Sequence, residues 1–147
     1  LQSAYEADDK SVFDDTVPYF MQLLSLADEL MLDQPERMLG YWIENARKAA
    51  SSDAEADQFE SNARWMVTLW GPDENAALHE YSFRLWAGLI ETFYTVRWQK
   101  FLTSVADLWG GFDQATFDAE ITSWEAEWTA RRGEDLAVVP NGQGLAV

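Results

Sequence analysis

The chain has 147 residues, enough for one domain with a single core, and 48% of them are hydrophobic, which excludes an intrinsically disordered chain. A formal net charge of −16 repels phosphate backbones and anionic lipid surfaces, so binding to nucleic acid or to a membrane surface is not expected. The absence of Cys excludes disulfides, thiolate metal sites and cysteine nucleophiles. No apolar run reaches the roughly 18 residues of a membrane span.

Apolar residues recur at helical spacing from the N-terminus. Residues 1–9 are expected to form the end of a helix, and residues 11–15 a polar connector. A second helix is predicted to begin with Thr16 as its N-cap and Pro18 in its first turn, where Pro is tolerated. The apolar residues that define this helix are Tyr19, Leu23, Leu26 and Leu30.

Two capping-box patterns, Asp33 to Glu36 and Ser52 to Glu55, predict where the next two helices begin. The first of these helices runs to about Ala50. The second ends at Trp70, because Gly71-Pro72 cannot continue a helix. Its apolar face is predicted to consist of Phe59, Ala63, Met66, Val67 and Trp70.

The second half of the chain predicts further helices. One carries a stripe at four-residue spacing, made of Leu78, Tyr81, Leu85, Leu89 and Phe93. Thr95 is expected to cap a further helix that ends at Gly110, with Trp98, Phe101, Leu102, Val105, Leu108 and Trp109 facing inward. Asp113 is expected to cap the last helix, whose inward face is Phe117, Ile121, Trp124 and Trp128.

The period-two alternation of a half-buried strand is not sustained anywhere. The sequence therefore predicts an all-α protein, a bundle of five to six helices with short connections. Residues 1–132 hold the helical domain, and residues 133–147 are expected to form a loop-like tail.

The sequence offers little acid–base or metal chemistry. There is no phosphate loop and no Ser-His-Asp set, and the single His79 is expected to be an exposed helix residue rather than a proton donor. Asp8-Asp9 and Asp14-Asp15 are expected near helix ends, where acids favour the helix dipole, and Glu125 is expected to point outward. We assign no catalytic residue, no metal and no cofactor.

Trp70 is the residue most open to a functional interpretation. Its predicted place at the end of a helix aims the ring at the end of the bundle. An indole face there can stack on a sugar ring, and its N–H can donate a hydrogen bond. The other interpretation is that the ring plugs the end of the bundle, and spacing alone favours neither.

Three motifs in fixed order connect the chain with a known family: Leu39-Gly-Tyr-Trp-Ile-Glu-Asn-Ala-Arg47, Asn62-Ala-Arg-Trp-Met-Val-Thr-Leu-Trp-Gly-Pro72, and Ala87-Gly-Leu-Ile90 followed by Phe93-Tyr94 and Arg97-Trp98. Together they resemble the C-terminal helical domain of the family 89 glycoside hydrolases, the α-N-acetylglucosaminidases.

This resemblance implies a division of labour. A (β/α)8 barrel would supply the two glutamates of a retaining mechanism. By the same resemblance, this barrel and the N-terminal helix of the helical domain are missing from the chain. The helical domain would be non-catalytic and would complete a pocket for terminal α-linked N-acetylglucosamine. The residues that match the family's substrate contacts are Trp70, Leu78 and Tyr81. The isolated chain is not expected to be active.

The resemblance also implies a secreted or lysosomal location, although the chain shows no targeting segment. Its expected partners are the catalytic barrel and the terminal N-acetylglucosamine of a glycan. Without the barrel we expect an exposed apolar patch that leads to self-association or to a retained partner chain. The alternative function is a stand-alone acidic helical protein-interaction module.

Overall fold

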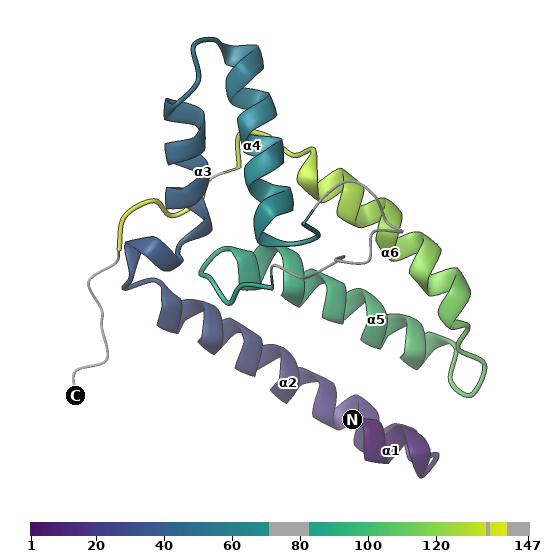
Figure 1. The fold of residues 1–147 in the computed structure, drawn as a ribbon. Coiled ribbons are helices and arrows are strands. Elements are labelled where there is room, and N and C mark those ends of the chain that lie inside the picture. The colour runs from purple at the N-terminus through teal and green to yellow at the C-terminus, as the bar shows by residue number, and fades with distance from the viewer. Residues whose placement is uncertain (71–82, 135, 141–147) are drawn as a thin grey trace.

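The computed structural model describes residues 1–70, 83–134 and 136–140 (Figure 1). Its α-helices are α1 (Gln2–Glu6), α2 (Lys10–Met31), α3 (Leu39–Lys48), α4 (Asp53–Val67), α5 (Val96–Asp107) and α6 (Gln114–Thr129). A 3-10 turn, η1 (Pro35–Arg37), precedes α3, and a π-helical segment, η2 (Ile90–Thr95), runs into α5. The described residues contain no strand, so the predicted all-α fold is confirmed.

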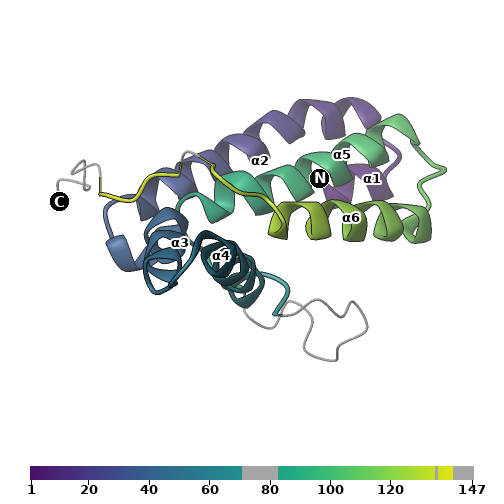
Figure 2. The same ribbon diagram turned by 90° about the horizontal axis from the view of Figure 1, so that it is seen from above.

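The helices form two groups. Helices α2, α5 and α6 lie side by side with α5 in the middle, and α3 and α4 form an antiparallel pair at one end of them (Figures 1 and 2). Along the described chain, no helix is long and apolar enough to cross a membrane.

Two clusters of buried residues form the core. One joins α3, α4, η2 and α6 through Leu39, Ile43, Val67, Leu69, Leu89, Phe93, Tyr94, Ile121, Trp124 and Trp128. The other joins α1, α2 and α5 through Ala4, Phe13, Leu102 and Val105. The four inward residues predicted for the last helix therefore do face the core, with Phe117 partly buried.

Helix α2 begins earlier than the sequence predicted. The Asp9 side chain accepts the N–H of Val12 and caps the helix, so residues 11–15 are helical and form no connector. Pro18 consequently lies inside the helix, and Thr16 is not its N-cap. Pro18 is exposed, so the carbonyl that loses its N–H partner remains within reach of water, which lets the helix continue.

The apolar stripe of α2 faces solvent. Tyr19 is 70% exposed and Leu23 is 63% exposed, and Leu26 and Leu30 are exposed as well. The core instead receives Phe13, which lies on a neighbouring face of the helix. An apolar patch is thus exposed on α2, while the packing of the barrel on it and self-association stay predictions.

The capping box predicted at residues 33–36 does not form. The chain makes the η1 turn there, and α3 starts only at Leu39 with no side-chain cap. Backbone pairing with a distant segment takes the place of the cap. The Leu39 N–H donates to the Ala87 carbonyl at 2.9 Å, and the Ala87 N–H donates to the Arg37 carbonyl at 2.8 Å.

Two other predicted caps are confirmed. The Ser52 hydroxyl accepts the Glu55 N–H at the start of α4, and the Asp113 carboxylate accepts the Thr116 N–H at the start of α6. Thr95 makes no side-chain cap, because η2 continues into α5 without a break. Leu85 is exposed and lies before the helical segment rather than on a buried stripe.

Some residues predicted to face inward are on the surface instead. Met66, Trp98 and Leu108 are all exposed. Glu125 was expected outside and is instead buried, with Arg97 Nε 3.0 Å from its carboxylate. An ion pair between α5 and α6 makes that burial tolerable.

A buried carboxylate joins α2 to η2. Asp28 Oδ1 accepts the N–H of Gly88 at 2.8 Å and the N–H of Glu91 at 2.9 Å, across 60 or more residues of chain. Gly88 has φ +77°, a conformation that suits glycine. Burial raises the pKa of Asp28, the two backbone N–H groups oppose that rise, and the charges of Glu91 and Glu29 add to it.

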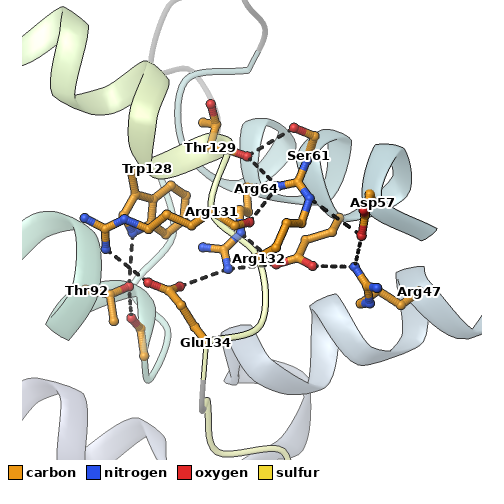
Figure 3. A network of polar contacts seen from close by, with 12 residues as sticks. Arg47, Asp57, Ser61, Arg64, Thr92, Trp128, Thr129, Arg131, Arg132 and Glu134 are labelled. Atoms are coloured by element: carbon orange, nitrogen blue, oxygen red, sulfur yellow. Dashed lines mark hydrogen bonds and ion pairs between the residues drawn. The ribbon is translucent and has the colours of Figure 1, made fainter. Parts of the chain in front are cut away.

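The second buried polar group is Arg64, which has no exposed surface. Its Nη2 lies 2.9 Å from Glu60 Oε1 and 2.9 Å from Glu134 Oε2, and its guanidinium lies 4.8 Å from the centroid of the Trp128 ring (Figure 3). Arg64 therefore ties α4 to Glu134 in the chain that follows α6.

The network extends to the surface in both directions. Arg47 bridges Asp57 and Glu60, and Arg131 pairs with Glu134 (Figure 3). Anions and cations therefore alternate from Asp57 through Arg64 to Arg131, which keeps the buried charges compensated.

The chain after α6 packs against the domain. Glu134 enters the Arg64 network, and Leu136 packs on the first core cluster. A Cβ on Gly40 would lie 2.3 Å from the Ala137 carbonyl oxygen, so this crossing requires glycine in α3. Of the described residues beyond α6, Glu134 and Leu136 are partly buried, and Ala137, Val138 and Val139 are exposed. The domain boundary at residue 132 stays a prediction.

The first prediction concerns Asp28. Asp28→Ala leaves the two backbone N–H groups without an acceptor and should lower the free energy of unfolding by roughly 2–4 kcal/mol. Asp28→Asn keeps an acceptor oxygen and should lose much less. Because the pKa of Asp28 is raised in the fold, the folded protein binds the Asp28 proton more tightly than the unfolded chain does. Proton binding therefore adds to the free energy of unfolding. This stabilisation is fully present below the ordinary pKa of an aspartate and is lost as pH rises through the folded-state pKa.

Urea unfolding of the wild type and of Asp28→Asn across pH tests this sign. The stability of the wild type relative to Asp28→Asn should fall as pH rises from about 4. Parallel pH profiles would show that Asp28 has its ordinary pKa in the fold.

The second prediction concerns Arg64. Arg64→Ala leaves Glu60 and Glu134 buried without their shared cation and should cost about 3–5 kcal/mol of stability. Arg64→Lys should recover only part of that loss, because an ammonium lacks the planar fork and stacks poorly on Trp128. Urea unfolding gives both values. The control is Arg47→Ala, which removes a half-exposed member of the same network; an equal loss for Arg47→Ala would contradict the central role of Arg64.

Candidate functional site

Trp70 lies just beyond the end of α4. The helix ends at Val67, and the Trp70 N–H donates to the Trp65 carbonyl at 2.7 Å. Trp70 has φ +71°, in the left-handed region, where a bulky side chain is an outlier. Such a conformation costs about 1–3 kcal/mol and persists only when the surrounding structure enforces it.

The turn that carries Trp70 is firmly held. Thr68 and Leu69 are buried, and the Thr68 hydroxyl donates to the Arg64 carbonyl at 2.7 Å. The Trp70 side chain itself is 44% exposed, in contrast to these two neighbours. This exposure favours a surface role over a plug for the bundle end, so the backbone presents the indole from a rigid support.

Trp70 is the only one of the three predicted substrate contacts that can be placed. Leu78 and Tyr81, and with them His79, Gly71 and Pro72, lie outside the described residues.

The buried carboxylates are committed to structural partners. Asp28 accepts backbone N–H groups, Glu60 and Glu134 share Arg64, and Glu125 pairs with Arg97. A catalytic acid or nucleophile needs an accessible carboxyl group with a free oxygen toward substrate. None of these four buried groups meets that requirement.

Three of the predicted surface acids, Asp8, Asp9 and Asp14, also have partners. Asp8 accepts the Trp109 indole N–H, Asp9 caps α2, and Asp14 pairs with Lys10 one turn earlier. The described residues contain no group of three or more His, Asp or Glu that could hold a metal ion.

Sequence reasoning missed the more distant partner of Arg64. Glu134 was assigned to a tail, and no pattern in the sequence indicates that it meets Arg64, which is 70 residues earlier. A signal for Arg64 was present, because it falls within the motif Asn62 to Pro72.

Comparison with known proteins places the chain in a family. Residues 1–147 match the family described as alpha-N-acetylglucosaminidase (NAGLU) C-terminal domain. The human alpha-N-acetylglucosaminidase is 39% identical over 107 residues, which cover 71% of this chain and 14% of the human protein.

Solved structures agree with that match. A family 89 glycoside hydrolase from Clostridium perfringens, in complex with 2-acetamido-1,2-dideoxynojirmycin, superimposes with a TM-score of 0.81 and 28% sequence identity, covering 97% of this chain and 17% of that chain. A second structure from the same organism, in complex with PUGNAc, gives the same values.

The chain thus spans about one sixth or less of the length of these relatives. The match of the whole sequence, the identity with the human protein and the shared helical arrangement agree with one another. The chain belongs to the C-terminal domain of the family 89 glycoside hydrolases, the α-N-acetylglucosaminidases.

Proposed function

We propose that this domain completes the sugar pocket of an exo-acting α-N-acetylglucosaminidase that removes terminal α-linked N-acetylglucosamine from glycans. The observation that carries the proposal is Trp70, a half-exposed indole on a strained backbone, in a turn held by the hydrogen bond from its N–H to the Trp65 carbonyl and by buried Thr68 and Leu69. Strain at an exposed aromatic residue is typical of sites where the side chain must be held in place before a ligand arrives.

In this role the Trp70 ring forms a wall against the apolar face of the sugar. The indole N–H adds a directional hydrogen-bond donor. Leu78 and Tyr81 are assigned as the second and third contacts, Leu78 through its apolar side chain and Tyr81 through its ring and hydroxyl. The family resemblance supports that assignment.

Bond cleavage is assigned to the part of the enzyme outside this chain. A retaining glycosidase needs two carboxyl groups about 5–5.5 Å apart on either side of the scissile bond. The buried carboxylates described here all bind arginine side chains or backbone N–H groups. A catalytic (β/α)8 barrel in the same polypeptide is the proposed partner.

The acidic composition is compatible with the proposed secreted or lysosomal location. A net charge of −16 opposes a compact fold by self-repulsion, and protonation of surface carboxylates at mildly acid pH relieves part of it.

The alternative, a stand-alone acidic protein-interaction module, is favoured by the exposed apolar face of α2. The mass of the polypeptide from its natural source separates the two functions. A mass that corresponds to several hundred residues supports the enzyme domain, and a mass near 16.8 kDa, that of the 147 residues alone, supports the module.

The third prediction is that the isolated 147-residue chain does not hydrolyse aryl α-N-acetylglucosaminides. The physical reason is that its buried carboxylates are neutralised by structural partners. The measurement is release of the aryl alcohol by the purified chain, with the full enzyme as the positive control. Turnover that disappears when one of the chain's own Asp or Glu residues is replaced would overturn the proposal.

The fourth prediction compares two replacements of Trp70 in the full enzyme. Both Trp70→Ala and Trp70→Gly remove the indole, so both should lower kcat/KM, by a loss of about 2–4 kcal/mol in transition-state stabilisation on the scale of a binding hot spot. Only Gly relieves the positive φ, so Trp70→Gly should be the more stable of the two by about 1 kcal/mol.

Trp70→Phe serves as the control because it keeps an aromatic face and the strained backbone. It should retain more kcat/KM than Trp70→Ala at an unchanged melting temperature. If Trp70→Phe instead loses stability while the remaining folded enzyme keeps normal kinetics, Trp70 is a core residue and the proposed sugar contact is wrong.

A further inference from the structure

The outer face of α2 carries a seam of apolar side chains with a coiled-coil repeat. Its members are Val12, Thr16, Tyr19, Leu23, Leu26 and Leu30, which alternate at intervals of four and three residues. We call this set the α2 seam. The five apolar members are each between 46% and 70% exposed. Over 18 residues of helix the seam extends for about 27 Å.

An apolar stripe of this length is unfavourable when it is exposed to water. Isolated exposed apolar residues are ordinary, but a continuous apolar stripe along a whole helix marks an interaction site. A 3.5-residue repeat is the spacing that keeps two helices in contact over several turns, through knobs packed into holes. The geometry of the seam therefore suits another α-helix lying along α2.

The seam continues into a groove beside it. A concavity of about 760 Å³ between α2 and α5 is lined by Tyr19 and Leu23 of the seam, by Phe20, and by Trp98 and Phe101 of α5. Helix α2 lies at the outer edge of the layer formed by α2, α5 and α6, so other helices cover it on one side only (Figure 2). A helix placed on the seam would thus contact α2 and α5 together.

The charges beside the seam specify the partner further. Asp15 and Glu29 lie one position before Thr16 and Leu30, on the flank of the seam that faces away from the core. Neither carboxylate forms an ion pair with any described residue. Flanking charges of this kind select partner and register in helix pairs.

A second copy of the chain fits poorly by this criterion. It would bring the same acidic flank and another chain of net charge −16 to the contact. A helix with Lys or Arg along one flank is complementary instead.

We infer that the α2 seam is the docking site for an amphipathic helix with a basic flank, supplied by the part of the same enzyme polypeptide that lies outside these 147 residues. Most of the length of the relatives lies outside the matched region, so such a polypeptide is available to supply it. The inference rests on membership of the family and needs no role for Trp70, so the kinetics of the Trp70 variants and the tests below fail independently.

The first test is hydroxyl-radical labelling of the full enzyme, read by mass spectrometry. If a helix covers the seam, Tyr19 should label as slowly as buried Phe13 of the same helix. This protection should be unchanged on dilution. Labelling of Tyr19 at the rate found in the urea-unfolded enzyme would overturn the inference. Protection that disappears on dilution would overturn it as well, because it would identify a second copy as the partner.

The second test is charge reversal in the full enzyme. Glu29→Lys should lower the melting temperature more than Glu127→Lys, a matched reversal at an exposed position of α6. The difference should shrink in high salt because the contact is partly exposed. Equal effects of the two substitutions would refute the basic flank. Leu23→Lys against Ser25→Lys repeats the comparison for the apolar seam, and equal melting temperatures there would refute a covered seam.

Discussion

The packing of the domain depends on the groups that compensate one fully buried guanidinium charge, that of Arg64. Arg64 has no exposed surface, and a charge without water is tolerated only with close counter-charges, which here contact its Nε and Nη2. Glu60 comes from its own helix, Glu134 comes from the chain after α6, and the Trp128 ring of α6 covers one side of the guanidinium. Two parts of the chain that are far apart in sequence, α4 and the region from the end of α6 to Glu134, must therefore meet at one place. This requirement fixes α4 against α6 and holds the C-terminal segment on the domain.

A strained tryptophan lies shortly after this buried charge in the sequence. The helix containing Arg64 ends one turn later, and the Thr68 hydroxyl donates to the Arg64 carbonyl. Thr68 and Leu69 are buried, and the Trp70 N–H donates to the Trp65 carbonyl. These contacts hold the turn in which Trp70 takes its left-handed conformation, while its side chain is half-exposed.

Local patterns in the sequence predicted much of the fold. The caps at Ser52 and Asp113, the buried face of α6 and the all-α class follow from interactions within about four residues, which a sequence displays directly. The motif from Asn62 to Pro72 pointed to both Arg64 and Trp70, and the family comparison bears out the identity that this motif suggested. The motif did not predict the partners of Arg64. It also did not predict whether the Trp70 side chain faces the core or the surface.

The sequence by itself determined the all-α class, the caps of α4 and α6, and the family to which the chain belongs. Only the tertiary structure decided which side of each helix is covered. The stripe from Tyr19 to Leu30 has the periodicity of a buried face and yet lies outside, because periodicity defines a face and says nothing about what packs on it. Asp28 and Glu125 are buried because distant backbone N–H groups and Arg97 meet them there. Such contacts depend on how helices far apart in the chain are brought together, and no local pattern encodes that.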